Sequence, residues 1–501
     1  MGHRLRDRAL TKEPKRRREV DVVIVGGGVA GLTAARRLKR GGIERVALLE
    51  LESAAGGTSI AGDVKFVRIP WGAHYLPLPM KGNQELLGFL KEVGIVEGFN
   101  EDGEPVAGEE HLCRDPGERV FFEGEWHEGL YPFAGATKND LGQLVAFRGQ
   151  ISHWATWRDE QDRRAFDIPL DNSSPSKDLR RLDRITMYDW MDEQGFTSPR
   201  LRWLVDYSCR DDYGLSMRDT SAWAGIFYFA ARQRNAQSTS QPVLTWPEGN
   251  GRLVGHLLDE VRDQVNVGWM VTSIEAASGQ RSMHRVVAVS VDEEATPVEY
   301  LAREVIFAAP QFVAPHVIQG MREDTPDRVS DFQYGSWLVA NVTLESRPDP
   351  NGFSLAWDNV LYDSPGLGYV VATHQRGLDH GPTVLTYYYA FCHGDPQHAR
   401  KELLSLDWKS CAKLVVTDLE RAHPNLRSRI SRLDVMRWGH AMIQPRPGFI
   451  WGDARRMAQA PWRGIHFANT DLSGVALFEE AFYHGLRAAD AVLESIKKRG
   501  V

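Results

Sequence analysis

The sequence has few of the residues that build disulfide-rich domains and zinc modules. Its 501 residues include four cysteines, Cys113, Cys209, Cys392 and Cys411, and none of them belongs to a CxxC pair. Neither a disulfide framework nor a zinc site is indicated. Metal-ligand spacings, a Ser/His/Asp order and paired carboxylates are also missing as sequence signals, so nothing in the chain points to metal-based or hydrolytic chemistry.

The start of the chain lacks an apolar run long enough to cross a membrane. Residues 22–35 carry no charge, but they number fourteen and end at Arg36 and Arg37, whereas a spanning helix needs about 20 apolar residues. No apolar core of a secretory signal precedes them. We therefore expect a cytoplasmic protein without a transmembrane segment.

The charge balance argues against a general affinity for nucleic acid. Sixty Lys and Arg residues stand against 67 Asp and Glu residues, which gives a net charge of −7. The first nineteen residues differ, because their basic residues outnumber their acidic ones. We expect 1–19 to form a solvated, partly disordered basic arm, and peripheral contact with a membrane surface or an acidic partner stays open.

The clearest positive signal is the stretch 22–50, VVIVGGGVAGLTAARRLKRGGIERVALLE. A β-branched run at 22–25 is followed by Gly26, Gly28 and Gly31, then by helical spacing, and a second apolar run ends at Glu50. This order predicts the strand, tight turn, helix and strand of a dinucleotide-binding unit. Gly26 permits the turn, Gly28 lets a pyrophosphate approach the backbone, and Gly31 allows helix and strand to pack closely.

The same unit predicts how the cofactor would be held. The phosphates should lie at the helix N-terminus, near Val29 and Ala30, where free N–H groups and the helix dipole favour negative charge. Glu50 follows Gly31 by nineteen residues. That position suits a carboxylate that accepts hydrogen bonds from the adenosine ribose.

Paired glycines and a Gly-Ala-His turn follow this unit and suggest a family. The order GxGxxG, acid, Gly-Gly, Gly-Ala-His resembles the flavin-containing amine oxidase and phytoene desaturase superfamily, whose first domain binds FAD. Many amine oxidases carry arginines beside the Gly-Gly pair, where this chain has Ala54 and Thr58. The residues that the resemblance assigns to FAD here are Gly56, Gly57, Thr58, Gly72, Ala73 and His74.

Two later stretches extend the resemblance along the chain. A strand candidate at 304–310 ends in Ala-Ala-Pro, and 465–471 reads as a strand and a turn before the closing helix. In the superfamily, segments of this kind contact the adenine and the flavin. The further FAD contacts implied are Val271, Ala309, Asp471 and Ala476, with Asp471 one place later than the usual acid.

We therefore predict an α/β protein with two interleaved domains. A Rossmann-like FAD-binding domain of the glutathione-reductase type is expected at 20–90, 241–330 and 432–501. A substrate domain of mixed sheet and helices is expected at 91–240, which reads as mostly helical, and at 331–431. Within it, alternation at 332–344 and 369–391 predicts strands below a substrate pocket, and the charged cluster at 210–212 reads as a solvated or salt-bridged turn.

The resemblance implies an FAD-dependent oxidoreductase that removes a hydride from a small molecule. Its substrate would be an amine or an unsaturated apolar compound, and the electron acceptor stays open. Many amine oxidases have a lysine near the flavin where this chain has Val339, and two facing aromatics of which Phe478 supplies one. These departures favour a dehydrogenase or a desaturase. The candidate catalytic residues are His74, His440 and Phe478, and none of them can be assigned as the base.

Two alternatives on the same scaffold stay open. Rab GDP-dissociation inhibitors resemble the superfamily in fold but use no flavin, and the complete fingerprint ending at Glu50 argues against that interpretation. A flavin-dependent isomerase or mutase, with no net redox change, would share every motif described above. Fold analogy alone cannot separate these activities.

Overall fold

The computed structural model describes residues 13–234, 241–279, 282–292, 295–325, 327–392 and 394–499. The chain divides into two compact units, and each is assembled from separate stretches of sequence. The first unit contains Met1–Ile60, Gly251–Phe332 and Trp451–Val501, and the second contains Ala61–Asn250 and Gln333–Ile450.

The predicted domain boundaries were wrong for two stretches. Residues 61–90 and 432–450 were expected in the cofactor domain but belong to the second unit. The reason is strand pairing, because β5 (Tyr75–Pro77) pairs with β10 (Val243–Thr245), and β19 (Ile430–Ile443) pairs along β15 (Tyr334–Leu344). A local sequence pattern predicts that a stretch forms a strand, but it does not show which other strand pairs with it.

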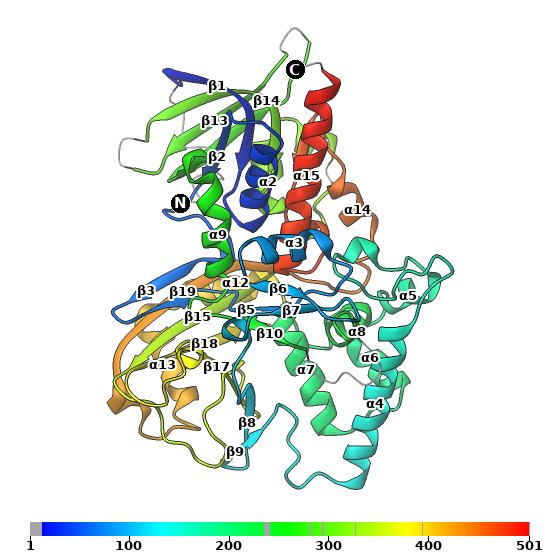
Figure 1. Cartoon of the computed structure of the whole chain (residues 1–501), viewed down its shortest axis with the longest axis vertical. Coiled ribbons are helices and arrows are strands. Elements are labelled where there is room, and N and C mark those ends of the chain that lie inside the picture. Colours follow the sequence, from blue (N-terminus) through cyan, green and yellow to red (C-terminus); the bar gives the residue numbers. More distant parts are fainter. Residues whose placement is uncertain are drawn as a thin grey trace. The chain divides into compact units, whose positions relative to one another are not determined.

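A seven-stranded sheet forms the centre of the first unit (Figure 1). Its middle strand β1 (Arg16–Val25) pairs in parallel with β2 (Val46–Glu50) and with β14 (Pro297–Phe307). Residues 22–25 and 46–49 are buried, as expected for parallel strands that are covered on both faces. The remaining strands are β11 (Val265–Val267), which pairs with β2, β13 (His284–Ser290) and β12 (Trp269–Glu275) beyond β14, and β20 (Ile465–Phe467), which pairs with the end of β14.

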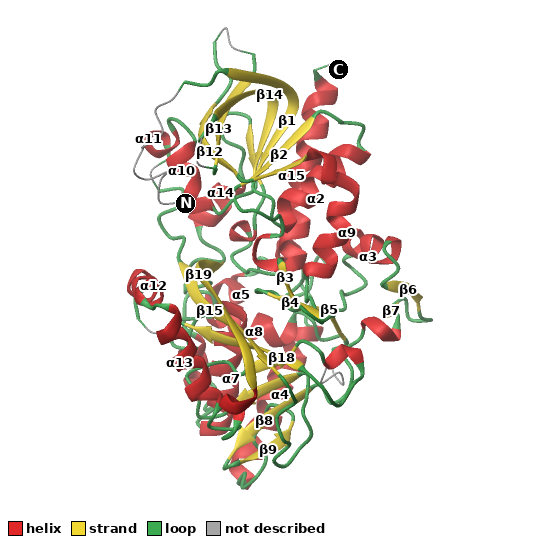
Figure 2. Cartoon of the chain, turned by 90° about the vertical axis from the view of Figure 1, so that its left-hand side faces the viewer, coloured by secondary structure: helices red, strands yellow, loops and turns green. Residues whose placement is uncertain are grey.

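Helices lie on both sides of this sheet. In Figure 2, α2 (Val29–Arg40) lies between α9 (Gly251–Val261) and α15 (Phe478–Lys498) on one side, and α10 (Ala314–Val317) and α11 (Met321–Asp324) lie on the other. Gly485 lets α15 approach α2, because a Cβ there would lie 2.4 Å from the Ala30 carbonyl oxygen. The first unit also contains α14 (Asp453–Gln459).

The prediction of a disordered basic arm was wrong for residues 16–19. Residues 16–19 open β1 and pair with residues 298–301 of β14, and Arg17 forms an ion pair with Glu299 at 2.5 Å. Backbone pairing needs no apolar side chain, so a charged stretch can extend an edge of a sheet while its side chains stay exposed. Residues 1–12 lie outside the described part of the chain.

A mixed seven-stranded sheet is the centre of the second unit. All its pairs are antiparallel except the parallel pair of β16 (Asp358–Leu361) and β8 (Glu118–Phe122). The order is β19, β15, β18 (Thr383–Ala390), β17 (Tyr369–Val371), β16, β8 and β9 (Glu125–Glu128). The strands expected at 332–344 and 369–391 are thus β15, β17 and β18, although η6 (His374–Arg376) and a turn interrupt the second stretch.

The two faces of this sheet have different roles, which follow from the alternation of side chains along a strand. Leu338 and Ala340 of β15 and Tyr387 of β18 pack in one buried cluster with α12 (Pro396–Ser405) and α13 (Trp408–Leu419). Val339 and Tyr388 belong to a second cluster on the other face. That second face lies toward the helices α7 (Pro199–Tyr213) and α8 (Ala222–Ala230).

The other elements of the second unit are short strands and helices. The stretch 91–240 was expected to be mostly helical, but its first part contains strands as well, because short hairpins form there. The remaining strands are β3 (Ala61–Val64), β4 (Val67–Pro70), β6 (Val96–Phe99) and β7 (Pro105–Ala107), and the remaining helices are α3 (Gln84–Glu92), α4 (Lys138–Thr156), α5 (Lys177–Leu182) and α6 (Met187–Glu193). Among the described residues, no helix has both the length and the apolar character needed to cross a membrane.

Replacing a β15 core residue tests how the second unit is held together. Leu338 is fully buried in the cluster beneath α12 and α13, so Leu338→Ala should lower the free energy of unfolding by about 2–5 kcal/mol through lost burial and a residual cavity. Urea unfolding followed by tryptophan fluorescence measures this change. Val145→Ala, at a side chain that is 69% exposed, should change the value by less than about 0.5 kcal/mol. Equal effects of the two variants would contradict the packing described.

Candidate functional site

The glycine turn after β1 is a tightly packed backbone loop. Gly26 has a φ of +103°, and a Cβ there would lie 3.0 Å from the carbonyl carbon of Ala308 and from the nitrogen of Ala309. A Cβ on Gly31 would lie 2.0 Å from the Gly26 carbonyl oxygen, so neither position accepts a side chain without a shift of the backbone. Gly28 differs, because a Cβ there would meet no atom nearer than the Cα of Gly57 at 3.9 Å. The loop is therefore closed toward β14 and open beside Gly28.

The helix α2 begins directly on this open side. Gly28 is its N-cap, and no side chain caps the helix. The N–H groups of Val29, Ala30 and Gly31 precede the first intrahelical donor, which is the N–H of Leu32 bonded to the Gly28 carbonyl. Free N–H groups at a helix N-terminus next to an open backbone are the arrangement that receives a pyrophosphate, so this part of the chain fits a dinucleotide.

Glu50 lies at the end of β2 and supports the same loop. Its carboxylate accepts hydrogen bonds from the Gly27 N–H at 2.6 Å and from the Glu52 N–H at 2.8 Å. Burial raises the pKa of Glu50, and these two hydrogen bonds oppose that rise. Each carboxylate oxygen can accept more than one hydrogen bond, so Glu50 retains the capacity predicted for binding ribose hydroxyls.

The predicted Gly-Gly segment lies against the glycine turn. The Gly56 N–H donates to the Gly27 carbonyl at 2.8 Å, and Gly56 and Gly57 have φ values of +136° and +58°. A Cβ on Gly57 would lie 3.3 Å from the Cα of Gly28. Thr58 is exposed in the short helix η1 (Gly57–Ser59) that follows. The structure thus brings the two glycine segments together, and the contact of Gly56, Gly57 and Thr58 with FAD stays a prediction.

The end of β14 and the C-terminal segment meet through side-chain hydrogen bonds. The Asn469 amide donates to the Ala308 carbonyl at 3.2 Å, and the Asp471 carboxylate accepts from the Gln311 N–H at 2.7 Å. Asp471 is buried in η8 (Thr470–Leu472), whereas Ala309 and Ala476 are partly exposed in the turns after β14 and before α15. Asp471 therefore connects two segments of the first unit, a role that its sequence position did not indicate.

Val271 is buried within β12, opposite Ala288 and next to an irregularity in the pairing of β12 with β13. The predicted adenine contact from this residue would have to come from its backbone, because its side chain is in the core. It remains a prediction.

The predicted segment 72–74 belongs to the second unit, where several donors fix its backbone. The Tyr388 hydroxyl donates to the Gly72 carbonyl at 2.9 Å, the Asn250 N–H to the Ala73 carbonyl at 3.1 Å, and the Thr245 hydroxyl to the His74 carbonyl at 2.9 Å. Every carbonyl of the segment is thus bound, and its conformation is specified by distant residues.

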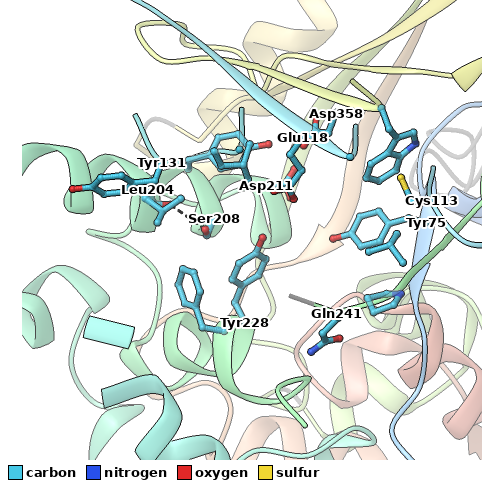
Figure 3. Close-up of a pocket in the computed structure, with 18 of the residues that line it drawn as sticks. Tyr75, Cys113, Glu118, Tyr131, Leu204, Ser208, Asp211, Tyr228, Gln241 and Asp358 are labelled. Carbon is cyan, nitrogen blue, oxygen red and sulfur yellow. Dashed lines mark hydrogen bonds between the residues drawn. The ribbon is translucent and has the colours of Figure 1, made fainter. Parts of the chain in front are cut away.

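The second unit encloses a cavity of about 1310 Å³ (Figure 3). Aromatic residues make much of its wall, and His74 is among them: its ring lies 4.8 Å from Tyr388, 5.1 Å from Tyr75 and 5.5 Å from Trp357. Another part of the wall is apolar and comes from α4, α8 and the loop before α4, with Leu130, Phe133, Leu144, Phe147, Ile151 and Phe229.

Three carboxylates from separate elements gather in this cavity. Glu118 comes from β8, Asp211 from α7 and Asp358 from β16, and Figure 3 shows their side chains next to one another. In the described part of the chain, no Lys, Arg or His side chain forms an ion pair with any of the three. Two basic residues, Arg148 and Arg232, also line the cavity, and the charge of Arg232 acts on Tyr75. No group of three or more His, Cys, Asp and Glu residues among those described is arranged to hold a metal ion.

Burial and neighbouring carboxylates raise the pKa values in this group. Burial raises the pKa of Asp211 to about 7, Asp212 and Glu118 add to the rise, and Arg210 opposes it. Burial also raises the pKa of Glu118 and, more strongly, that of Asp358, although hydrogen bonds from Asn359 and Tyr207 oppose the latter. By accessible surface Glu118 is exposed and Asp211 and Asp358 are half-buried, and all three line the cavity. A cation in the cavity would relieve this repulsion.

Sequence reasoning missed this acidic group. The cluster at 210–212 was expected to be a solvated or salt-bridged turn, and no paired carboxylates stood out. Arg210 does pair with Asp206 at 3.0 Å, but Asp211 lies on the helix α7 and lines the cavity. Glu118 and Asp358 are far from it in sequence, and only the parallel pairing of β8 with β16 makes those two direct neighbours.

The three candidate catalytic residues do not share one environment. His74 lines the cavity, where burial lowers its pKa to about 4, so it is neutral and a weak base at physiological pH. His440 lies on β19, 5.7 Å from the Tyr334 ring, and is not among the described residues that line the cavity. Phe478 is the first residue of α15 and stacks on Phe482 at 6.4 Å. Val339, expected where many oxidases have lysine, is buried with Tyr388.

The fold and the glycine turn define a dinucleotide-binding protein with an interleaved second unit. Residues 29–493 match the model of the flavin containing amine oxidoreductase family. The chain belongs to this family and is an FAD-dependent oxidoreductase, as the sequence motifs predicted.

The similar proteins have several different activities. Oxidoreductase PigB of a Serratia species is 23% identical, with 95% of this chain and 75% of PigB covered. Putrescine oxidase has the same fold at 15% identity, with a TM-score of 0.68 over 95% of this chain and 100% of that one. Cyclohexylamine oxidase from Brevibacterium oxydans (15% identity, TM-score 0.66) matches 96% of this chain and 100% of that one. For a fatty acid isomerase from P. acnes (14% identity, TM-score 0.64) these shares are 96% and 99%.

Two glycine substitutions separate cofactor binding from folding. Gly28→Ala meets open space, so the protein without FAD should keep its melting temperature while the added methyl group displaces the pyrophosphate and weakens FAD binding at least tenfold. Gly31→Ala forces a shift of the Gly26 carbonyl, so it should lower both the affinity and the melting temperature. Flavin fluorescence titration and thermal unfolding measure the two quantities. Gly88→Ala, which meets nothing within 4 Å, is the control. Normal FAD affinity in Gly28→Ala would contradict the site.

Proposed function

We propose that this protein oxidises an amine whose cationic nitrogen is recognised by the carboxylates of the cavity. The observation that carries the proposal is the group of Glu118, Asp211 and Asp358, which has no basic partner among the described residues and is surrounded by aromatic rings. A negative charge with poor access to water is costly unless it is paired or neutralised by a proton. A substrate ammonium group would pair with the carboxylates, whereas with an uncharged apolar substrate they could relieve their repulsion only by taking up protons.

Aromatic residues support the same assignment. Tyr75 and Tyr228 extend their hydroxyl groups toward the space beside the carboxylates (Figure 3). Burial raises the pKa of both phenols well above the ordinary value, so they stay protonated and can accept hydrogen bonds from an ammonium group. Their rings and that of Trp357 also attract a cation through its contact with the ring face.

The apolar part of the cavity wall indicates what the rest of the substrate molecule is like. The apolar side chains contributed by α4 and α8 would favour an apolar skeleton attached to the amine, and the volume of about 1310 Å³ exceeds the ~300–1,000 Å³ usual for small-molecule sites. We therefore infer an amine with a bulky or extended hydrocarbon part. An oxidised C–C bond in an apolar compound is the less favoured alternative.

The chemistry divides between the cofactor and the chain. FAD, held by the glycine turn, the N-terminus of α2 and Glu50, supplies the hydride acceptor when it is bound. The chain's own residues bind the ammonium group, exclude water and remove its proton before oxidation. Asp211, with a pKa of about 7, is suited to accept that proton at a carboxylate oxygen, because its proton affinity lies near the working pH.

Anaerobic addition of amines tests the proposed function. Hydrophobic primary amines should bleach the flavin absorption near 450 nm, and unsaturated hydrocarbons of similar size should not. Asp211→Asn should raise the amine dissociation constant about tenfold to a hundredfold, because it removes a charge-assisted contact of ~1.5–3 kcal/mol, without loss of bound FAD. Asp63→Asn, at a carboxylate that is 77% exposed in the same unit, should match the parent protein. Bleaching by hydrocarbons alone would refute the amine assignment.

The proposal also predicts the direction in which the amine dissociation constant changes with pH. The Asp211 pKa of about 7 lies above its ordinary value, so the carboxyl group takes up a proton as pH falls through 7 and loses its attraction for a cation. The amine dissociation constant should therefore increase from pH 8 to pH 6, while the amine itself stays protonated. His74 does not titrate in this range, because its pKa is about 4. Spectral titrations at several pH values should show this slope flattened in Asp211→Asn, and an unchanged slope would exclude Asp211 as its source.

A further inference from the structure

Arg119 is a fully buried cation that has no carboxylate partner in the described part of the chain. Its guanidinium lies 3.8 Å from the centre of the Trp126 ring and donates to the Phe353 carbonyl at 2.9 Å. Two further N–H groups donate to the Asn359 amide oxygen at 2.5 Å and to the Tyr369 hydroxyl at 3.0 Å. A buried charge is costly unless it is paired, so packing alone does not explain an arginine at this position.

The groups around the guanidinium are fixed by hydrogen bonds of their own. The Tyr369 hydroxyl, which accepts from Arg119, is also bonded to the His423 ring at 2.7 Å. Burial and the charge of Arg119 lower the pKa of His423 to about 3, so this ring is neutral. The Asn359 amide donates to the Ala356 carbonyl at 2.9 Å. Arg119 is thus attached to β16 and β17 through neutral partners that are themselves held in place.

The opposite face of the same two strands carries two of the cavity carboxylates. In the register of β8 with β16, Glu118 is the neighbour of Asp358, and Arg119 is the neighbour of Asn359. Successive side chains point to opposite faces of a sheet, so the acidic pair faces the cavity and the Arg119–Asn359 pair lies behind it. Neighbouring strands are ~4.8 Å apart, and like charges side by side destabilise a strand pair. When ionised, the two carboxylates therefore oppose the pairing of β8 with β16.

The strand pairing that the carboxylates oppose is short. In the sheet order, β8 lies between β16 and the last strand, β9. The pairing of β8 with β16 covers four residue pairs and is parallel, which is slightly less stable per residue than an antiparallel pairing. Hydrogen bonds from a charged donor are stronger than neutral ones, and those of Arg119 join β8 to β16 and β17. Arg119 therefore adds attachment where the carboxylates weaken it.

We propose that Arg119 is a positioning residue for the amine site, which holds Glu118 and Asp358 together from the back of the sheet. It does not contact the substrate and acts by keeping β8 on β16 against the repulsion between the carboxylates. Its planar guanidinium reaches three acceptors in fixed directions, which the ammonium group of a lysine cannot do. The effect on amine binding rests on the proposed function, whereas the effect on β8 does not.

Hydrogen exchange of the full chain with FAD bound tests the positioning directly. Arg119→Met removes the donors and keeps an unbranched side chain, so the amide protons of residues 118–128 should exchange at least about tenfold faster. Adding Glu118→Gln removes the repulsion and should restore most of the protection. A general role in the core would not be corrected by this second change. Unchanged exchange in Arg119→Met, or fast exchange that persists in the double variant, would overturn the proposal.

Amine binding gives a second readout. Arg119→Met and Arg119→Lys should both raise the dissociation constant of a hydrophobic primary amine about tenfold, with the same amount of FAD bound per chain. Parent-like binding by Arg119→Lys would show that charge matters and hydrogen-bond geometry does not, and the proposal would fail. If no amine binds to the parent protein, the proposed function fails, while the exchange result still decides the role of Arg119.

A matched control comes from the first unit. Arg328 is also a buried arginine, which lies 4.3 Å from the centre of the Phe467 ring and donates to the carbonyls of Ala458 and Ala460. Arg328→Met should leave the exchange of residues 118–128 at the parent rate. Equally fast exchange there in Arg119→Met and Arg328→Met would show a general loss of stability and overturn the proposal. If neither Arg119 variant folds, Arg119 serves the core as a whole and the proposal fails.

Discussion

The close approach of backbone segments around Gly26 and Gly31 is the constraint on which the first unit depends. A Cβ on Gly31 would lie 2.0 Å from the Gly26 carbonyl, so α2 can start directly behind β1 only if that residue is glycine. This start leaves N–H groups at the helix N-terminus unpaired and turned toward an open backbone at Gly28. The same packing places the end of β14 beside the turn. The cofactor site predicted here is therefore set by backbone geometry more than by charged side chains.

In the cavity of the second unit, side-chain charge is the distinguishing feature, and not backbone geometry. The specificity proposed for it comes from side-chain charge, because Glu118, Asp211 and Asp358 line it without ion-pair partners in the described chain. Such an arrangement reduces stability, since each carboxylate raises the proton affinity of the others. Groups that cost stability in the folded protein are typical of functional sites.

Prediction from sequence succeeded where neighbouring residues decide the structure. The fingerprint from Val22 to Glu50 is local, and so is the alternation that separates Tyr387 from Tyr388: Tyr387 packs under the helices, whereas Tyr388 lines the cavity. Prediction failed where the structure depends on which strands pair with one another. Nothing in the stretch 61–90 indicated that β5 pairs with β10. Residues 16–19 join β1 because β14 extends far enough to pair with them.

By itself, the sequence determined the dinucleotide-binding unit, the family and the cofactor, because glycines at set spacings constrain the backbone wherever they occur. Only the tertiary structure decided which carboxylates share the cavity, since Glu118, Asp211 and Asp358 come from three distant elements and read separately as ordinary surface acids. Burial and electrostatic coupling depend on distances in space, and spacing along the chain carries no record of them.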